Sequence, residues 1–254
     1  MPPNTTPNKQ ENVFLFTPNL IGYTRILFAI TSLYCMPYHP RTCTLLYSIS
    51  CLLDALDGTA ARYLNQSTCF GAVLDMVTDR CTTTCLLVFL ASTFPAWSIL
   101  FQGLISLDYS SHYIHMYATL VDGGKSSHKE VGGRGEWPWA LRVYYGDSKV
   151  LFTTCALNEL FFIALYLLSF SFSFSVDSTP SVGVEGWSSS TWSAGAMEMA
   201  RANKISSFWP WVLFYASLPF MLYKQYVNVL QLVQASRWIA QGDVEVRLRK
   251  RSSR

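Results

Sequence analysis

Six long apolar runs dominate this chain of 254 residues and constrain its fold more than any other feature. They cover residues 13–37, 42–64, 71–93, 96–120, 150–172 and 207–233. A helix needs about 20 apolar residues to cross the hydrocarbon core of a bilayer, and each run reaches that length. Only 14% of the residues are charged, against about a quarter in soluble domains. The sequence therefore predicts an all-α, polytopic membrane protein with six transmembrane helices.

The segments between these runs leave room for a single membrane domain, residues 1–254. In the first run, Pro18, Asn19 and Arg25 precede the cleanly hydrophobic stretch 26–36, which predicts an N-terminal interfacial turn before the first span. A polar, glycine-rich loop is predicted for 121–149. The other segments are a polar N-terminal tail at 1–12, a variable Ser-rich loop at 173–206 and a basic C-terminal tail at 235–254.

Basic residues are unevenly distributed along the chain, and their distribution predicts its orientation. They gather in the loop 121–149 and in the C-terminal tail. With six spans, both termini and this loop lie on one side of the membrane, and the positive-inside rule makes that side cytoplasmic. A basic tail can also bind nucleic acid, but contact with anionic lipid is the favoured interpretation for a polytopic protein. We therefore expect a lipid bilayer, and no nucleic acid, as a partner.

Four aspartates lie inside the second and third apolar runs, at positions Asp54, Asp57, Asp75 and Asp79. A charged side chain at the membrane centre costs about 2.5–3.5 kcal/mol on insertion scales, so four of them are hard to explain as inert structure. At 100° per residue, Asp54 and Asp57 share one helix face, and Asp75 and Asp79 share another. The connection 63–70 is short, which predicts antiparallel helices whose acidic faces meet near the cytoplasmic end.

Such a group of carboxylates needs counter-charge, and two interpretations supply it. Mg²⁺ or Mn²⁺ prefer oxygen ligands, and two such ions can clamp a diphosphate. Gly58, Ala61 and Gly71 would then let a nucleotide lie close to the helix backbones, and Arg62 is placed to meet phosphate. Alternatively, the carboxylates pair with Arg62 and Arg80, or line a path for ions.

The spacing of these residues matches a known signature. It runs Asp54, two residues, Asp57-Gly58, two residues, Ala61-Arg62, eight residues, Gly71, three residues, Asp75, three residues, Asp79. It resembles the signature of the CDP-alcohol phosphotransferase family at all eight fixed positions. The resemblance implies six transmembrane helices, a homodimer and a site for two Mg²⁺ or Mn²⁺ ions at the cytoplasmic face of the endoplasmic reticulum membrane. It also implies transfer of a phosphatidyl group from a CDP-linked donor to an alcohol, with release of CMP.

The resemblance also implies a role for each matching residue. Asp79 is the expected general base on the acceptor hydroxyl, and it is also one of the expected metal ligands, which are Asp54, Asp57, Asp75 and Asp79. The CDP part of CDP-diacylglycerol would be held by Gly58, Ala61, Arg62 and Gly71. Asn19 and Arg25 in the first run are expected either to reach the nucleotide or headgroup of this donor or to fix the entry of the first helix.

The segments that flank the signature, within residues 13–130, resemble family members that use myo-inositol as the acceptor. Asp108, Ser111, His112 and His115 lie at i, i+3, i+4 and i+7, so they share one helix face. A polyol needs several hydrogen-bonding groups in one pocket, and Asp108, Ser111 and His112 are the candidates.

Several alternatives remain open at this point. The two histidines could serve interhelical packing instead, and the acceptor could be serine, glycerol 3-phosphate or an aminoalcohol. A carrier whose aspartates conduct ions, or a catalytically dead scaffold, would belong to different functional classes.

Overall fold

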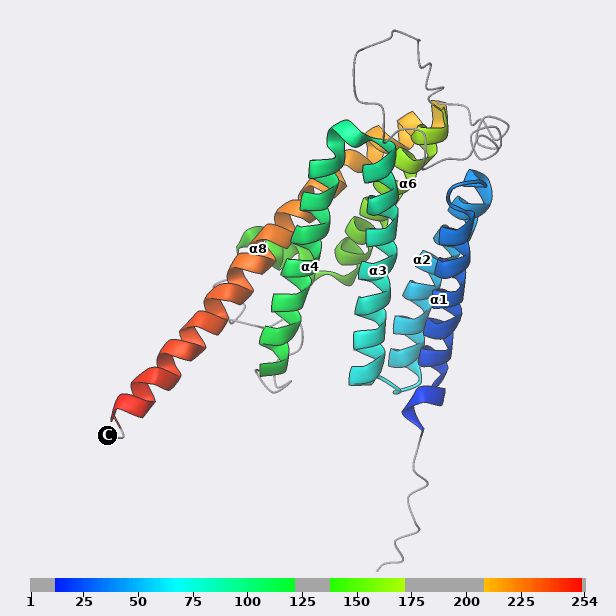
Figure 1. Cartoon of the computed structure of the whole chain (residues 1–254). Coiled ribbons are helices and arrows are strands. Elements are labelled where there is room, and N and C mark those ends of the chain that lie inside the picture. Colours follow the sequence, from blue (N-terminus) through cyan, green and yellow to red (C-terminus); the bar gives the residue numbers. More distant parts are fainter. Residues whose placement is uncertain (1–11, 122–137, 172–207, 253–254) are drawn as a thin grey trace, which may run out of the picture. The chain divides into compact units, whose positions relative to one another are not determined.

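The computed structural model describes residues 12–121, 138–171 and 208–252, and these residues are helical almost throughout (Figure 1). Predictions about residues 1–11, 122–137, 172–207 and 253–254 lie outside this range. The described elements are η1 (Val13–Leu15), α1 (Thr17–Cys35), α2 (Pro40–Tyr63), α3 (Cys69–Thr93), η2 (Pro95–Trp97), α4 (Ser98–Val121), α5 (Trp139–Gly146), α6 (Ser148–Ser171) and α8 (Phe208–Ser252).

The all-α prediction is confirmed for the described residues, and each predicted apolar run contains one long helix. By length and composition alone, α6 is the one described helix that could cross a membrane, with a mean hydropathy of 1.8 over its most apolar window. This helical structure is consistent with a membrane protein. The count of six spans stays a prediction.

The first described elements form a tight N-terminal hook. In η1, the Asn12 side chain accepts a hydrogen bond from the backbone N–H of Phe14. Pro18 then lies in the first turn of α1, where its missing N–H costs no hydrogen bond. Asn19, also in that turn, donates from Nδ2 to the carbonyl of Val13 at 2.6 Å. This bond fastens η1 to α1. A membrane-surface location for this turn remains a prediction.

The described residues divide into two compact units within α3, after Thr82. The first unit contains η1, α1, α2 and the beginning of α3. In it, α1 and α2 lie side by side (Figure 1), and the Ser50 hydroxyl of α2 donates to the backbone carbonyl of Arg25 at 3.1 Å. Between α2 and α3 the chain turns at Asn65, whose φ of 52° is left-handed, a conformation that Asn tolerates better than most residues.

The second unit contains the rest of α3 with α4, α5, α6 and α8, and α8 packs against both α4 and α6. The prediction of a loop over 121–149 is wrong at its end, because α5 forms there. Tyr144 of α5 is buried against Val227 of α8 and accepts a hydrogen bond from the buried Lys224 ammonium at 2.7 Å. Tyr223 also donates to the carbonyl of Ala140 at 3.0 Å. Contacts with a distant helix therefore stabilise this short one.

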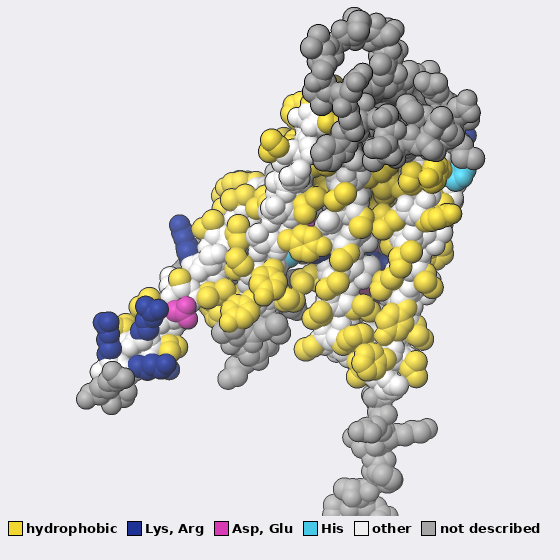
Figure 2. All heavy atoms as spheres, viewed as in Figure 1, with side chains coloured by type: hydrophobic (Ala, Val, Ile, Leu, Met, Phe, Trp, Pro, Cys, Tyr) yellow, Lys and Arg dark blue, Asp and Glu magenta, His cyan; other side chains and the backbone are white. Residues whose placement is uncertain are grey.

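The last helix is longer than its apolar run. Although that run ends near 233, α8 continues to Ser252, so the predicted basic tail is helical over its described part. Figure 2 shows lysine and arginine side chains at the C-terminal end of α8 and hydrophobic side chains over much of the visible surface of the helices. Large hydrophobic side chains such as Leu27, Leu52 and Ile99 are more than 60% exposed. Such a surface needs an apolar partner.

Candidate metal and nucleotide site

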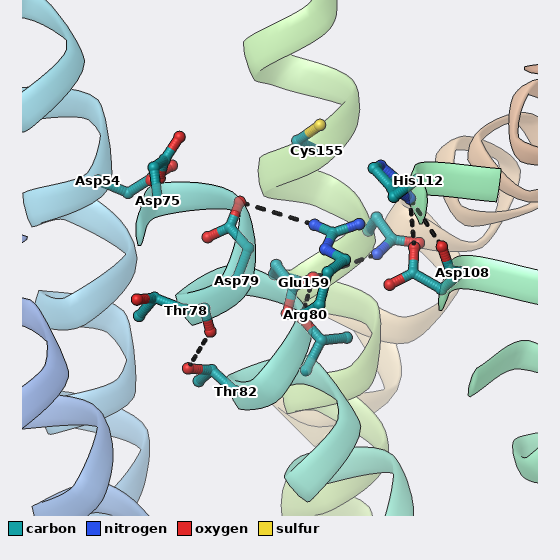
Figure 3. A network of polar contacts seen from close by, with 12 residues as sticks. Asp54, Asp75, Thr78, Asp79, Arg80, Thr82, Asp108, His112, Cys155 and Glu159 are labelled. Atoms are coloured by element: carbon teal, nitrogen blue, oxygen red, sulfur yellow. Dashed lines mark hydrogen bonds and ion pairs between the residues drawn. The ribbon is translucent and has the colours of Figure 1, made fainter. Parts of the chain in front are cut away.

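Three carboxylates from two helices converge in the first unit. Asp54 and Asp57 of α2 and Asp75 of α3 each offer one oxygen, and these oxygens all lie within 4.8 Å of one another. Asp57 is buried, whereas the side chains of Asp54 and Asp75 are 33% and 45% exposed. Figure 3 shows Asp54 and Asp75 beside one another. The two acidic faces therefore meet, as the short connection between the helices predicts.

The fourth aspartate lies one helical turn farther along α3. Asp79 forms an ion pair with Nη2 of Arg25, and its Oδ2 lies 3.6 Å from Nη2 of Arg80. Figure 3 shows the contact with Arg80. Two arginines thus hold Asp79, while the other three carboxylates form the compact group.

Arg25 of α1 pairs with all four carboxylates. The sequence singled it out only as a contact for the nucleotide or headgroup, or for the entry of the first helix. Its side chain is 4% exposed. Its Nη1 lies 2.6 Å from Oδ1 of both Asp54 and Asp75 and 3.7 Å from Oδ2 of Asp57. The available signal was an arginine inside an apolar run, six residues after Asn19, but the sequence could not link it to carboxylates 29 to 54 positions away.

The donor set fits a divalent cation. Carboxylate oxygens are the hard ligands that Mg²⁺ and Mn²⁺ prefer. Four ionised aspartates carry four negative charges, and the Arg25 guanidinium neutralises one of them. A group with this excess of negative charge, from two helices and partly open to solvent, could bind a metal ion.

Beside the carboxylates, the first unit contains a cavity of about 200 Å³. Asp57 and Asp75 are among the residues that line it. The same cavity is lined by all five residues expected to hold the donor: Asn19, Gly58, Ala61, Arg62 and Gly71. Carboxylates and candidate nucleotide contacts thus share one continuous site.

The glycines of this cavity differ in what surrounds them. A Cβ on Gly71 would lie 2.9 Å from Oδ1 of Asn19 and 3.2 Å from the Thr68 hydroxyl, which is too close for an unaltered structure. A Cβ on Gly58 would meet the Arg62 guanidinium at 3.6 Å, an ordinary contact. Gly71 therefore permits a close approach of α1 to α3. At Gly58, the missing side chain leaves space in the cavity beside the Arg62 guanidinium.

The candidate acceptor residues belong to the second unit, on α4 (Figure 3). His112 Nδ1 lies 2.8 Å from the carbonyl of Asp108 and 3.4 Å from its carboxylate. The Ser111 hydroxyl, fully buried, donates to the same carbonyl at 3.0 Å. Asn228 of α8 donates to the Asp108 carboxylate at 3.4 Å. The structure brings the three predicted residues together and adds Asn228. The fourth member of the helix face, His115, stacks on Tyr145 of α5 with ring centroids 6.1 Å apart.

Comparison with known proteins identifies the family. The family model for CDP-alcohol phosphatidyltransferase matches residues 15–170, which include every residue of the carboxylate group and the cavity. The chain belongs to this family.

Curated relatives cover almost the whole chain. The chain is 48% identical to CDP-diacylglycerol--inositol 3-phosphatidyltransferase of Schizosaccharomyces pombe, over 94% of each chain. It is 44% identical to the human protein of that name, over 95% of this chain and 99% of the other, and 42% identical to that of Saccharomyces cerevisiae, over 96% of both. Similarity thus extends well beyond residues 13–130. No solved structure matches.

Proposed function

We propose that this protein is a CDP-diacylglycerol–inositol 3-phosphatidyltransferase, which converts CDP-diacylglycerol and myo-inositol into phosphatidylinositol and CMP. The observation that carries the proposal is a complete phosphotransferase signature, most of whose residues line one cavity beside a compact group of carboxylates. Relatives that bear this name match nearly their full length at 42–48% identity.

The carboxylates would hold the divalent cations. Asp54, Asp57 and Asp75 offer a compact set of oxygens, and Asp79 lies one turn away on the same face of α3. We propose all four as ligands of two Mg²⁺ or Mn²⁺ ions. When bound, these ions neutralise charge on the donor diphosphate and on the departing CMP.

Asp79 would act as general base. It takes the proton of an inositol hydroxyl while that oxygen attacks the β-phosphorus of CDP-diacylglycerol. The new P–O bond forms to inositol, the bond to the CMP oxygen breaks, and CMP leaves with the electron pair. General-base catalysis contributes about 10²–10⁴-fold, and positioning contributes more. The ion pair with Arg25 keeps the Asp79 carboxylate directed into the first unit.

The walls of the cavity would bind the nucleotide part of the donor. Arg62 can meet phosphate oxygens with its guanidinium, and Gly58 and Ala61 leave its surroundings unobstructed. Asn19 would shape the cavity wall and would not donate to the nucleotide through its amide nitrogen, because that nitrogen already donates to the Val13 carbonyl.

For the acceptor, we propose the polar group on α4. Asp108, Ser111 and His112 offer both donors and acceptors, which suits an uncharged polyol. An uncharged polyol does not need a cationic pocket, whereas an acceptor that carries a phosphate would need one.

The proposed setting is the endoplasmic reticulum membrane, with six spans, the active site facing the cytoplasm, and a homodimer. Support comes from α6, which can cross a bilayer, and from the large exposed hydrophobic side chains. The basic C-terminal end of α8 supports a cytoplasmic C-terminus through the positive-inside rule.

An acceptor panel tests the proposal. The purified protein in lipid–detergent micelles would receive CDP-diacylglycerol, Mg²⁺ or Mn²⁺, and labelled myo-inositol, serine, glycerol 3-phosphate or an aminoalcohol. We expect metal-dependent CMP release and a lipid product with inositol. No product with inositol, or ion flux in sealed vesicles without CMP release, would overturn it.

A substitution tests the base. Asp79→Asn should lower kcat by about 10²–10⁴-fold without unfolding the protein. The matched control is Asp243→Asn, the same change at an exposed position of α8, which should retain activity. Normal turnover by Asp79→Asn would refute the assignment.

A further inference from the structure

A single arginine nitrogen lies where three carboxylates converge. Nη1 of Arg25 is 2.6 Å from oxygens of Asp54 and Asp75 and 3.7 Å from an oxygen of Asp57. These are the same three residues that offer metal-ligating oxygens within 4.8 Å of one another. The second nitrogen, Nη2, pairs with Asp79. The arginine comes from α1, outside the aspartate-bearing helices.

We infer that Arg25 is a built-in counter-cation of the carboxylate site and competes with the divalent cation for the same oxygens. The inference rests on the proposed function, because it concerns the metal site of that reaction. Arg25 is here a positioning residue, which lines the cavity and acts through the four aspartates.

The geometry makes the two cations mutually exclusive at these oxygens. Mg²⁺ binds oxygen at 2.0–2.1 Å, so an ion among the three carboxylates would lie within van der Waals contact of Nη1. Two positive charges at that distance repel strongly in a partly desolvated site. The guanidinium must therefore withdraw from Asp54 and Asp75 as the ion binds.

Burial explains why Arg25 stays within the site in both states. Its side chain is 4% exposed, and its carbonyl accepts a hydrogen bond from Ser50 of α2, which fixes the backbone. A buried guanidinium without an acidic partner is costly. When Nη1 withdraws from Asp54 and Asp75, Nη2 can keep its ion pair with Asp79. Arg25 then still positions the proposed general base, while the other carboxylates are free to bind the ion.

Removing the positive charge should therefore strengthen metal binding. Arg25→Gln should bind Mn²⁺ at least about tenfold more tightly than the wild type, since one of the charges that oppose the ion is gone. Arg25→Lys keeps the charge and should stay within about threefold of the wild type. The control Arg41→Gln removes an arginine that lies about 20 Å from Asp54 along α2, and it should leave the affinity for Mn²⁺ unchanged.

The experiment measures Mn²⁺ binding to the purified full-length protein by electron paramagnetic resonance of the free ion, without substrates. Equal or weaker binding by Arg25→Gln would overturn the inference. Binding of Mn²⁺ by the wild type, together with the acceptor panel above, tests the proposed function separately.

Thermal unfolding supplies a second readout. In EDTA, Arg25→Gln should unfold at a lower temperature than the wild type, because the carboxylates lose their counter-charge. Saturating Mn²⁺ should remove that difference, and Arg25→Lys should resemble the wild type throughout. A Gln variant that fails to fold even with Mn²⁺ present would also overturn the inference, because the ion should replace the guanidinium.

Discussion

Gly71→Ala tests whether the close approach of α1 to α3 shapes the nucleotide cavity. The new methyl group would lie 2.9 Å from Oδ1 of Asn19, a distance that forces Asn19 to move. Asn19 is 2% exposed and donates to the Val13 carbonyl at 2.6 Å. Its displacement therefore breaks the bond that fastens η1 to α1.

The effects on stability nearly cancel, whereas the effects on activity do not. Alanine in place of glycine stabilises a helix by up to about 1 kcal/mol, and by less in the first turn, where Gly71 lies. A broken hydrogen bond costs about 0.5–1.5 kcal/mol, and more if a buried group stays unpaired. We expect the free energy of unfolding to change by less than about 2 kcal/mol. A comparable loss of transition-state binding lowers kcat/KM for CDP-diacylglycerol about 10- to 30-fold.

Steady-state kinetics with CDP-diacylglycerol as the varied substrate measures the effect. The matched control is Gly103→Ala on α4, where a Cβ meets nothing within 4 Å. The double variant Gly71→Ala/Asn19→Ala should be no worse than Asn19→Ala alone, since the clash partner is gone. Equal kinetics for Gly71→Ala and Gly103→Ala, or additive losses in the double variant, would refute the reasoning.

Three further predictions concern the ions, the acceptor and the second unit. Chelation with EDTA should abolish CMP release, and Mg²⁺ or Mn²⁺ should restore it; activity that survives chelation would contradict the carboxylate site. His112→Ala should raise the KM for inositol about tenfold and leave the KM for CDP-diacylglycerol unchanged, because a hydrogen-bonding group contributes about 0.5–1.5 kcal/mol; equal effects on both constants would argue for a packing role. Tyr144→Phe removes the hydroxyl that accepts from the buried Lys224 ammonium, so it should destabilise the protein by about 1–3 kcal/mol without changing either KM; an unchanged unfolding midpoint would show that this bond contributes little.

The long helices were predictable because each apolar run is long enough for a helix that crosses a bilayer. The ends of these helices were less predictable. The 3.6-residue period does not distinguish an apolar helix that stops from one that continues into a polar stretch, and α8 continues past 233 to Ser252. The short helix α5 was missed because its stability comes from Tyr144 and Lys224, whose positions are 80 residues apart in the sequence.

The carboxylate group was predictable for a different reason. Asp54, Asp57 and Asp75 lie on two adjacent helices joined by a short connection, so helix periodicity alone brings them together. Arg25 was missed as a partner because it comes from α1, and a pattern along the sequence does not show which face of one helix meets another. Likewise, Asn19 lies so near Gly71 that an added Cβ would be 2.9 Å from its Oδ1, and this approach depends on three-dimensional packing and has no local signal.

Arg25 leaves the ribosome before any of its four carboxylate partners, because α1 precedes α2 and α3 in the chain. In the proposed topology α1 spans the membrane, and a lone arginine at the centre of such a helix costs about 2.5–3.5 kcal/mol on insertion scales. Asp54 of α2 follows Arg25 by 29 residues and Asp79 of α3 by 54, so the first partner emerges with α2 and the last with α3. We therefore expect these three helices to integrate stably only together during translation. Nascent chains arrested before α3 should be extracted from the membrane more easily than longer ones.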